Sequence, residues 1–516
     1  MGLFLGLDSS TQSLSAIVVD TERRTIALDE SVNFGKSLPE YGSPHGFLPN
    51  PDARIKHANP LMWVQALEIL IERIKTKGFD LGSIEGVSGA GQQHGSVYLR
   101  GPLRGWAEAA PLHEQVAPLL SRNTSPIWMD SATSQECREI ALALGGDSEV
   151  VKISGSRAIE RFTAAQIRRF AKLEPAAYEG TGEIQLVSSF LASLLAGHSV
   201  PIDLGDGAGM NLLDLERGGW SPALVAATAP GLAAKLAAPV PSTTRVGVVA
   251  DYFVRKFGFR SNTPLFAFTG DNPSSLIGMG ASEPGTAVIS LGTSDTVFAA
   301  MREPRTDPRG FGHVFGNPAG GFMSLICFAN GSLAREGVKD RFGMSWPDFD
   351  RAIREETRPG NDGNAMLPFF VPEMTPKVAA PKVELFGDAE FTSWGRPAAA
   401  VRAIVEAQAL SMRRHSDWIG EQPSSLLVTG GASRNAGILQ IIADVFQAEL
   451  RTLPVGNSSA LGGALRAAQA VEGTSFAELA RAFAAPDPNL WVRPDPTAKA
   501  VYDELGARFA ERLARL

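Results

Sequence analysis

The chain has 516 residues, of which 44% are apolar and 20% charged, a balance typical of globular proteins with a large buried core. Its 48 lysines and arginines stand against 55 aspartates and glutamates, and the net charge of -7 gives no general attraction to nucleic-acid phosphates. We therefore expect no nucleic-acid partner. With only two cysteines, Cys137 and Cys327, the sequence excludes a disulfide framework and favours a reduced, cytoplasmic location. The run Leu186–Ala196 is too short to span a bilayer, so it predicts a buried helix and no membrane partner.

The first predicted element is a β-hairpin over residues 2–20, with a turn of small polar residues between two strand-like runs. Its opening run reaches Asp8 too early for a signal peptide. Small residues in a tight turn let backbone N–H groups approach an anion, which makes Ser10 and Thr11 candidates for phosphate binding. The turn also fits an ordinary hairpin. Asp8 would repel a phosphate unless a divalent cation such as Mg²⁺ lay between them, although a lone aspartate also forms turns.

A helix is predicted next over Leu61–Lys75, where apolar residues recur every three or four positions. The segment after it has a strand from Ile84, the small polar cluster SGAGQQHGS, and a second strand at 97–99. His94 lies in this polar cluster and not on an apolar face, which favours polar recognition. The same region nearly matches the GxSxG nucleophile motif of hydrolases, but Ala90 replaces the final glycine.

The second half repeats the layout of the first. A strand over 287–291, the turn GTSDT with Thr293, and a resumed strand over 297–299 form another hairpin with a small polar turn. Turn-forming residues between positions 240 and 262 indicate a boundary, and we divide the chain into domains 1–258 and 259–516. The repetition predicts two related halves.

Further along, a helix over Ala399–Trp418 precedes a strand over Ser425–Val428, the turn TGGASRN and an amphipathic helix. Alternating strands and helices predict an α/β fold. A glycine turn at the start of a helix suits a nucleotide, and it also suits any strand-to-helix corner. Neither the P-loop pattern nor the GxGxxG and protein-kinase patterns are present in the sequence.

The segment FTGDNPSS places Asp271 and Asn272 at the end of an apolar strand and directly before a proline. A carboxylate beside an amide at a strand end is a plausible base and substrate anchor, and the same residues are common in turns. Two stretches lack periodicity and are expected to be loops or insertions: residues 100–125 and 373–397.

Together these segments resemble the FGGY family of carbohydrate kinases, within the actin, sugar kinase and Hsp70 superfamily, and most closely the longer xylulose kinases typical of animals. The resemblance runs through nearly the whole chain. It is carried by SGAGQQHGS at 88–96, PIWMDS at 126–131, GSRAIERFT at 155–163, DGAGMNLL at 206–213, FTGDNPS at 268–274, SLGTSDT at 290–296 and TGGAS at 429–433.

This resemblance implies two ribonuclease-H-like domains with an active-site cleft between them, the sugar bound mainly by the first and ATP mainly by the second. It implies that Asp271 is the general base and that Asp8 positions Mg²⁺. The implied sugar contacts are His94, Arg161, Asp271 and Asn272. The implied nucleotide contacts are Ser10, Thr11, Thr293, Trp346, Gly430, Gly431, Ala432 and Asn435.

The implied reaction is ATP-dependent phosphorylation of D-xylulose to D-xylulose 5-phosphate. One departure from the family pattern is Ile159, where relatives tend to have an aromatic residue. It leaves D-ribulose, L-xylulose or a pentitol open as the substrate. A catalytically silent sugar or nucleotide sensor is a further alternative, and the presence of both Asp8 and Asp271 argues against it, because a binding module needs no base. The sequence leaves the oligomeric state open.

Overall fold

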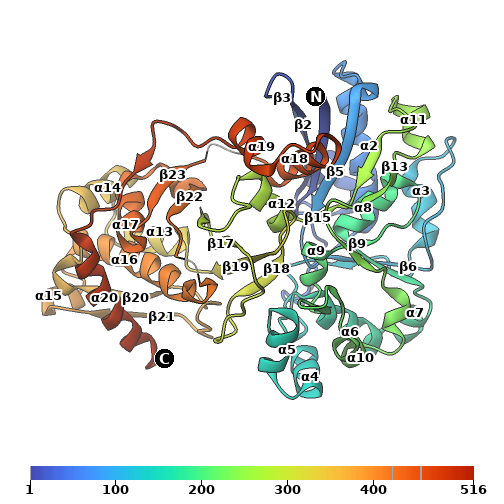
Figure 1. The fold of residues 1–516 in the computed structure, drawn as a ribbon. Helices are drawn as coiled ribbons and strands as arrows, with labels where there is room; N and C mark the ends of the chain where they lie inside the picture. The colour runs from blue at the N-terminus through green and yellow to red at the C-terminus, as the bar shows by residue number, and fades with distance from the viewer. Residues whose placement is uncertain (1, 421, 454–455) are drawn as a thin grey trace. The chain divides into compact units, whose positions relative to one another are not determined.

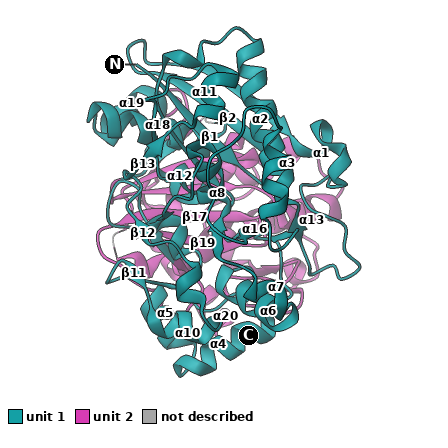
Figure 2. Ribbon diagram, turned by 90° about the vertical axis from the view of Figure 1, so that its right-hand side faces the viewer, with its two compact units in different colours: residues 1–282, 314–323, 456–484 teal, residues 283–313, 324–455, 485–516 magenta. Residues whose placement is uncertain are grey.

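The computed structural model describes residues 2–420, 422–453 and 456–516. The chain divides into two compact units, which Figure 2 shows in teal and magenta. The first unit comprises residues 1–282, 314–323 and 456–484, and the second comprises residues 283–313, 324–455 and 485–516. The chain thus crosses between the units several times, which a single boundary at residue 258 does not describe.

The first unit is built on a mixed seven-stranded sheet with the order β13-β14-β5-β1-β2-β3, and β15 also pairs with β5. The strands β1, β2 and β3 are antiparallel, whereas β5 runs parallel to β1. Because β14 and β15 pair with β5, this unit continues past residue 258 to Ser282. The strands are β1 (Leu3–Ser9), β2 (Ser13–Asp20), β3 (Thr25–Asn33), β5 (Ile84–Gly91), β13 (Arg245–Val248), β14 (Pro264–Phe266) and β15 (Thr269–Gly270).

Alternation along β1 sends its side chains to two different layers of helices. Leu5 and Leu7 belong to the apolar core shared with α2 (Pro60–Thr76) and α8 (Val187–Ala196). Gly6 faces the opposite way, toward the backbone of α18 (Ser458–Glu472). Asp8 alternates with Leu7, so its side chain lies on the α18 face of the sheet.

Glycines let α18 approach both the sheet and α12 (Asp271–Gly278) at backbone distance. A Cβ atom at Gly462 would lie 2.7 Å from the carbonyl carbon of Ser274 in α12, and one at Gly463 would lie 3.0 Å from the Cα of Gly89 in β5. Both distances are shorter than the 3.5–4.0 Å of a normal carbon–carbon contact. Figure 1 shows α18, in red, beside α12 in this unit. A segment from the end of the chain therefore covers one face of the first sheet.

The strand pattern is repeated in a second sheet with the order β18-β19-β17-β16-β22-β23-β24. Its strands β16, β17, β22, β23 and β24 lie in the second unit, whereas most of β18 and the start of β19 fall within residues 314–323 of the first unit. The hairpin β16–β17 is antiparallel, and β22 runs parallel to β16 as β5 runs parallel to β1. The prediction of two α/β halves with the same layout is confirmed. The strands are β16 (Thr286–Leu291), β17 (Asp295–Met301), β18 (His313–Gly316), β19 (Phe322–Phe328), β22 (Ser425–Thr429), β23 (Glu449–Thr452) and β24 (Trp491–Val492).

The strongly periodic segments fold as predicted. The helix expected over Leu61–Lys75 is α2, with Asn59 capping its first turn, and the buried helix near Leu186–Ala196 is α8. The expectation of loops at 373–397 is wrong in part, because β21 (Lys382–Phe386) lies there and pairs with β20 (Ala365–Phe369). Residues 100–125 likewise contain the short helix α3 (Leu112–Val116). These pieces are too short to display a period in the sequence.

The remaining helices and strands divide between the two units. In the first unit they are α1 (Phe34–Ser37), β4 (His57–Ala58), β6 (Ser96–Leu99), α3 (Leu112–Val116), β7 (Ser125–Pro126), α4 (Ser134–Leu144), α5 (Asp147–Ser154), α6 (Thr163–Leu173), α7 (Pro175–Glu179), β8 (Glu183–Leu186), β9 (Ile202–Asp203), α9 (Leu204–Ala208), β10 (Leu213–Asp214), β11 (Gly219–Trp220), α10 (Pro222–Thr228), β12 (Pro239–Val240), α11 (Asp251–Phe257) and α19 (Phe476–Phe483). In the second unit they are α13 (Ser332–Arg341), α14 (Trp346–Arg354), β20 (Ala365–Phe369), β21 (Lys382–Phe386), α15 (Ala389–Thr392), α16 (Pro397–His415), α17 (Ala436–Phe446) and α20 (Ala498–Leu513).

Across the described residues, no helix has both the length and the apolar character needed to cross a membrane.

Candidate active site

Three strand ends meet at one edge of the first sheet. The parallel register pairs Ser9 of β1 with Gly91 of β5, and Gly91 pairs in turn with Gly270 of β15. Residues that follow these strands therefore lie side by side, as polar residues commonly do at the carboxyl edge of an α/β sheet. This geometry brings Gln93 and Asp271 together from positions far apart in the sequence.

Asp271 is the first residue of α12, and its carboxylate is held by several N–H groups. Its Oδ1 accepts the backbone N–H of Gln93 at 3.3 Å, the backbone N–H of Asn272 at 2.9 Å and the amide of Asn272 at 3.1 Å. The Asn272 amide also donates to Gln93 Oε1 at 2.9 Å. Burial raises the pKa of Asp271 to about 6 despite these hydrogen bonds. The carboxylate is thus fixed in orientation and more basic than an exposed one.

Asp8 lies close enough to Asp271 for the two charges to interact. Burial first, and then repulsion by Asp271, raise the pKa of Asp8 to about 7, while a hydrogen bond from Ser459 of α18 acts in the opposite direction. Within the described part of the chain, Asp8 Oδ1 is buried without a hydrogen-bond partner. A buried polar atom left unpaired costs about 1–3 kcal/mol, so this oxygen is suited to a ligand.

Mg²⁺ fits this position. It prefers oxygen ligands and is commonly held by one or two carboxylates together with waters and substrate phosphates. The described residues contain no group of three or more histidine, cysteine, aspartate or glutamate side chains arranged to hold a metal by themselves. Asp8 therefore suits a magnesium site whose other ligands are waters and substrate phosphates, and not a site formed by protein side chains alone.

His94 follows Gln93 and has a left-handed backbone, at φ 72°. Its Nδ1 lies 2.8 Å from the carbonyl oxygen of Gly209, and its ring packs on Phe162 at 4.4 Å between centroids. Burial, aided by the nearby Arg161 charge, lowers the pKa of His94 to about 3. The ring is therefore neutral, donates from Nδ1 to that carbonyl, and leaves Nε2 as an acceptor.

Other buried polar atoms gather around this cluster. Gln92, Gln93 and Asp206 each have at least one buried side-chain nitrogen or oxygen that no other described residue satisfies. Asp206 is fully buried, and its pKa is raised by burial and by the neighbouring charges of Asp203 and Asp271. The sequence showed the glutamine pair only as part of a polar strand end. The contact between Gln93 and Asp271 depends on strand pairing and was missed.

The turn after β1 is held from two sides. Ser10 closes it by donating its backbone N–H and its hydroxyl to the carbonyl oxygen of Ser13, at 2.9 and 3.0 Å. Thr11 Oγ1 accepts the indole N–H of Trp128 at 2.8 Å. The side chain of Trp128 otherwise remains largely exposed, so the tryptophan extends over the turn.

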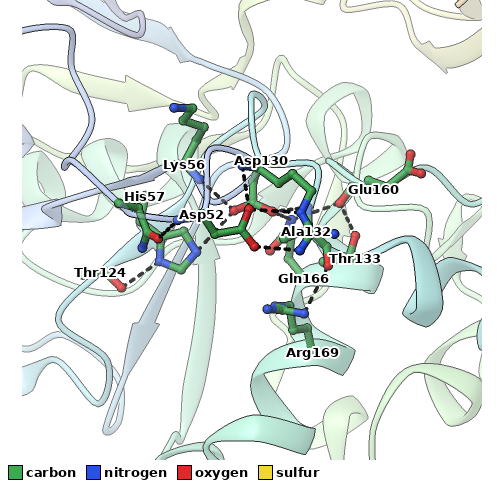
Figure 3. A network of polar contacts seen from close by, with 12 residues as sticks. Asp52, Lys56, His57, Thr124, Asp130, Ala132, Thr133, Glu160, Gln166 and Arg169 are labelled. Carbon is green, nitrogen blue, oxygen red and sulfur yellow. Dashed lines mark hydrogen bonds and ion pairs between the residues drawn. The ribbon is translucent and has the colours of Figure 1, made fainter. Parts of the chain in front are cut away.

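The buried carboxylate of Asp130, two residues after Trp128, is the centre of a network of hydrogen bonds (Figure 3). Asp130 accepts the backbone N–H of Lys56 at 2.9 Å, the backbone N–H of Ala132 at 3.0 Å and the amide of Gln166 at 2.8 Å. These bonds tie three separate segments together. The carboxylate oxygens of Asp130 thus already have hydrogen-bond partners within the protein, and this residue supports the structure around the site.

The second unit brings its own set of predicted residues together at the equivalent sheet edge. Because β16 and β22 are parallel, the turn with Thr293 and the turn with Gly430 emerge beside each other. Gly430 has φ 94°, and a Cβ atom there would lie 2.8 Å from the carbonyl carbon of Leu291. Only glycine fits at this position. Thr293, Gly430 and Gly431 are exposed.

Ala432 and Asn435 lie just before α17, and Trp346 lies on α14, which contacts that helix. Ala432 lies in the short helical turn after the glycines, and Asn435 caps α17 by accepting the N–H of Ile438 at 2.9 Å. Trp346 begins α14 and is 43% exposed. Asp350 of α14 accepts the N–H of Gly437 at 3.1 Å, which fixes α14 against the start of α17. The helix that begins with the exposed Trp346 is therefore hydrogen-bonded to the helix that follows the glycine turn.

Both halves of the chain match models of one family. The model of the N-terminal domain of the FGGY family of carbohydrate kinases matches residues 3–278, and that of the C-terminal domain matches residues 287–471. Xylulose kinase from Rattus norvegicus is 40% identical over 531 aligned residues, covering 99% of this chain and 96% of the relative. Xylulose kinase 2 from Arabidopsis thaliana is also 40% identical, covering 90% of this chain and 87% of the relative.

Solved structures share the fold at low identity. The xylulose kinase from Rhodospirillum rubrum has a TM-score of 0.83 at 21% identity, covering 100% of this chain and 99% of that one. Plasmodium falciparum glycerol kinase with ADP has a TM-score of 0.80 at 16% identity, covering 99% and 98%. With both family models matched and relatives alike over nearly the whole chain, the protein belongs to the FGGY family of carbohydrate kinases.

Proposed function

We propose that this protein transfers the γ-phosphate of ATP to D-xylulose and forms D-xylulose 5-phosphate. The names of its relatives support the sugar, since xylulose kinases from a mammal and a plant are about 40% identical to it. The observation that carries the chemistry is the Asp271 carboxylate, held by N–H groups at the meeting point of three strands with a pKa raised to about 6.

In the proposed reaction Asp271 is the general base. A sugar hydroxyl is a weak nucleophile at neutral pH, so Asp271 accepts its proton while the hydroxyl oxygen forms a bond to the γ-phosphorus. The bond from that phosphorus to the bridging oxygen breaks, and ADP leaves with the electron pair. A positioned base contributes about 10²- to 10⁴-fold to the rate. With a pKa of about 6, Asp271 is ionised at neutral pH and is a stronger base than an exposed aspartate.

The sugar is proposed to bind to the polar atoms around this base. Nε2 of the neutral His94 accepts a sugar hydroxyl, and Arg161 donates to a sugar oxygen. The Asn272 amide nitrogen already donates to Asp271 and Gln93, so Asn272 contacts the sugar through its Oδ1, which accepts a hydroxyl. The unpaired amide nitrogen of Gln93 supports such a site, because a bound hydroxyl would satisfy it. Orientation of the reacting hydroxyl beside Asp271 accounts for much of the remaining acceleration.

ATP is proposed to bind at the glycine and serine turns. The proposed phosphate contacts are Ser10, Thr11 and Thr293, and the proposed adenosine contacts are Trp346, Gly430, Gly431, Ala432 and Asn435. The exposed position of Thr293 in a tight turn supports phosphate binding, and the exposed ring of Trp346 supports packing against a base. Asp8 would hold Mg²⁺, which neutralises phosphate charge when bound.

The test is ADP release from Mg-ATP against a panel of ketopentoses, hexuloses and pentitols, with Asp271→Ala measured beside the unaltered protein. Turnover selective for D-xylulose that falls at least about 100-fold in Asp271→Ala is expected. Asp251→Ala is a matched control, because Asp251 is also the first residue of a helix but is exposed. Selective turnover of D-ribulose, L-xylulose or a pentitol would overturn the choice of sugar. A complete lack of sugar-dependent turnover would refute the kinase and favour a sensor.

A further inference from the structure

The turn Gly292–Ser294 has an exposed side and a buried side. Thr293 and Ser294 are exposed, whereas the next residue, Asp295, is fully buried. The Asp295 carboxylate accepts the backbone N–H of Gly292 and thus closes the turn from beneath. Its position leaves the carboxylate unable to reach a ligand on the exposed side, so its action on the site passes through the turn.

Arg335 of α13 holds this carboxylate through two parallel contacts. Its Nη1 lies 2.8 Å from Asp295 Oδ2, and its Nη2 lies 3.1 Å from Asp295 Oδ1. The same Nη1 donates to Gln408 Oε1 of α16 at 2.9 Å. Both charged side chains are at most 1% exposed. A guanidinium–carboxylate pair of this kind fixes direction as well as distance.

The network also fixes the segment that lies against the turn. Gln408 Nε2 donates to the carbonyl oxygens of Asn330 and Gly331, at 2.6 and 2.9 Å. Ser332 then donates its backbone N–H to the carbonyl oxygen of Gly292 at 2.8 Å. A Cβ atom at Gly331 would lie 2.7 Å from that same oxygen, so the close approach requires glycine. The turn is therefore held both from beneath and from the side.

We propose that Asp295, Arg335 and Gln408 are positioning residues that preset the turn Gly292–Ser294 for the phosphates of the nucleotide. This inference rests on the proposed function, in which that turn meets ATP. A buried ion pair is a poor way to stabilise a fold, because apolar residues of similar volume often do as well or better. It is an effective way to fix a short turn in one geometry, which phosphate binding by backbone N–H groups requires.

The test uses Arg335→Lys, which keeps the charge and removes the two-pronged geometry. Its matched control is Arg402→Lys, since Arg402 is also buried in this unit and pairs with Glu406 at 2.9 Å. We expect Arg335→Lys to raise the KM for Mg-ATP about tenfold, or about 1.4 kcal/mol, with the KM for the sugar unchanged. Amide hydrogen exchange over residues 292–295 should accelerate in Arg335→Lys and stay unchanged in Arg402→Lys.

A second variant, Gln408→Leu, covers the case in which Arg335→Lys fails to fold. It frees the 330–331 segment but leaves the ion pair, and we expect the same two changes at smaller size. The inference is overturned if the variants that fold match Arg402→Lys in both KM for Mg-ATP and exchange at the turn. Amide hydrogen exchange at the turn and the affinity for Mg-AMP-PNP, a non-hydrolysable analogue of ATP, can both be measured without a sugar. The affinity for this analogue then takes the place of the KM for Mg-ATP. Inactivity of the unaltered protein on every sugar would therefore refute the proposed kinase function separately, while these two measurements still decide the role of the network.

Discussion

The substitution Gly462→Ala tests how closely α18 must pack on the helix that begins with Asp271. Its new Cβ atom would lie 2.7 Å from the carbonyl carbon and 2.9 Å from the Oγ of Ser274 in α12. Normal carbon–carbon contact needs at least about 3.5 Å, so the two backbones must separate by about 1 Å. Overpacking of this kind costs up to about 3 kcal/mol. Alanine regains about 1 kcal/mol of helix propensity, which leaves a net loss of about 2 kcal/mol.

The turnover rate of this variant should fall by more than the loss in free energy of unfolding alone would suggest. A displacement of about 1 Å at a catalytic group can lower the rate about 100-fold, and α12 carries Asp271 at its first position. Differential scanning calorimetry and steady-state ADP release measure the two effects. The control is Gly506→Ala, where the nearest neighbour of the added carbon is a leucine methyl at 3.4 Å. We expect it to raise stability by about 0.5–1 kcal/mol with unchanged kcat. If Gly462→Ala behaves like this control, the reasoning about backbone contact is refuted.

Three further predictions concern the site in the first unit. The kcat/KM for the sugar should decrease as pH falls through about 6, because Asp271 has its pKa raised to that value and only the ionised carboxylate accepts a proton; a pH–rate profile measures this. His94→Leu removes one hydrogen-bond acceptor and should raise the KM for the sugar about tenfold with the KM for ATP unchanged, as measured by steady-state kinetics. Asp130→Ala leaves two buried donors and one part-buried donor without their acceptor and should lower the free energy of unfolding by about 3 kcal/mol in urea titrations.

Each of these has a contrary outcome. A kcat/KM that stays constant down to about pH 4.5 would show that the base has an ordinary carboxylate pKa. Equal effects of His94→Leu on both substrates would place the histidine outside the sugar site. An Asp130→Ala protein as stable as the unaltered one would mean that the network in Figure 3 does not support the segment that carries Trp128.

The sequence predicted those helices and strands whose apolar residues recur at regular spacing. The buried stripe of α2 and the apolar alternation of β1 are visible in the sequence because each depends only on neighbours a few positions away. The same holds for Asp8 and Asp271 as candidates, since a carboxylate in a small polar turn at a strand end is a local feature. Their roles in catalysis and metal binding remain predictions.

Other features depend on residues that are distant in the sequence. The pairing of β20 with β21 joins short runs that show no clear period. Gln93 contacts Asp271 only because β5 lies between β1 and β15. The Asp295–Arg335 pair likewise links a turn to a helix that follows much later. A single sequence contains no signal for such long-range pairs, because neither propensity nor periodicity depends on them.

The return of α18 to the first unit has a consequence for synthesis on the ribosome. Residues 1–282 emerge first, while the helix that covers Gly6 ends at Glu472, about 190 residues later. At 5–20 residues per second that interval lasts roughly 10 to 40 s. During this time the carbonyl oxygens of Gly89 and Ala267 lack Arg466, which binds both of them in the finished protein. Until α18 has been synthesised, that face of the first sheet therefore remains uncovered.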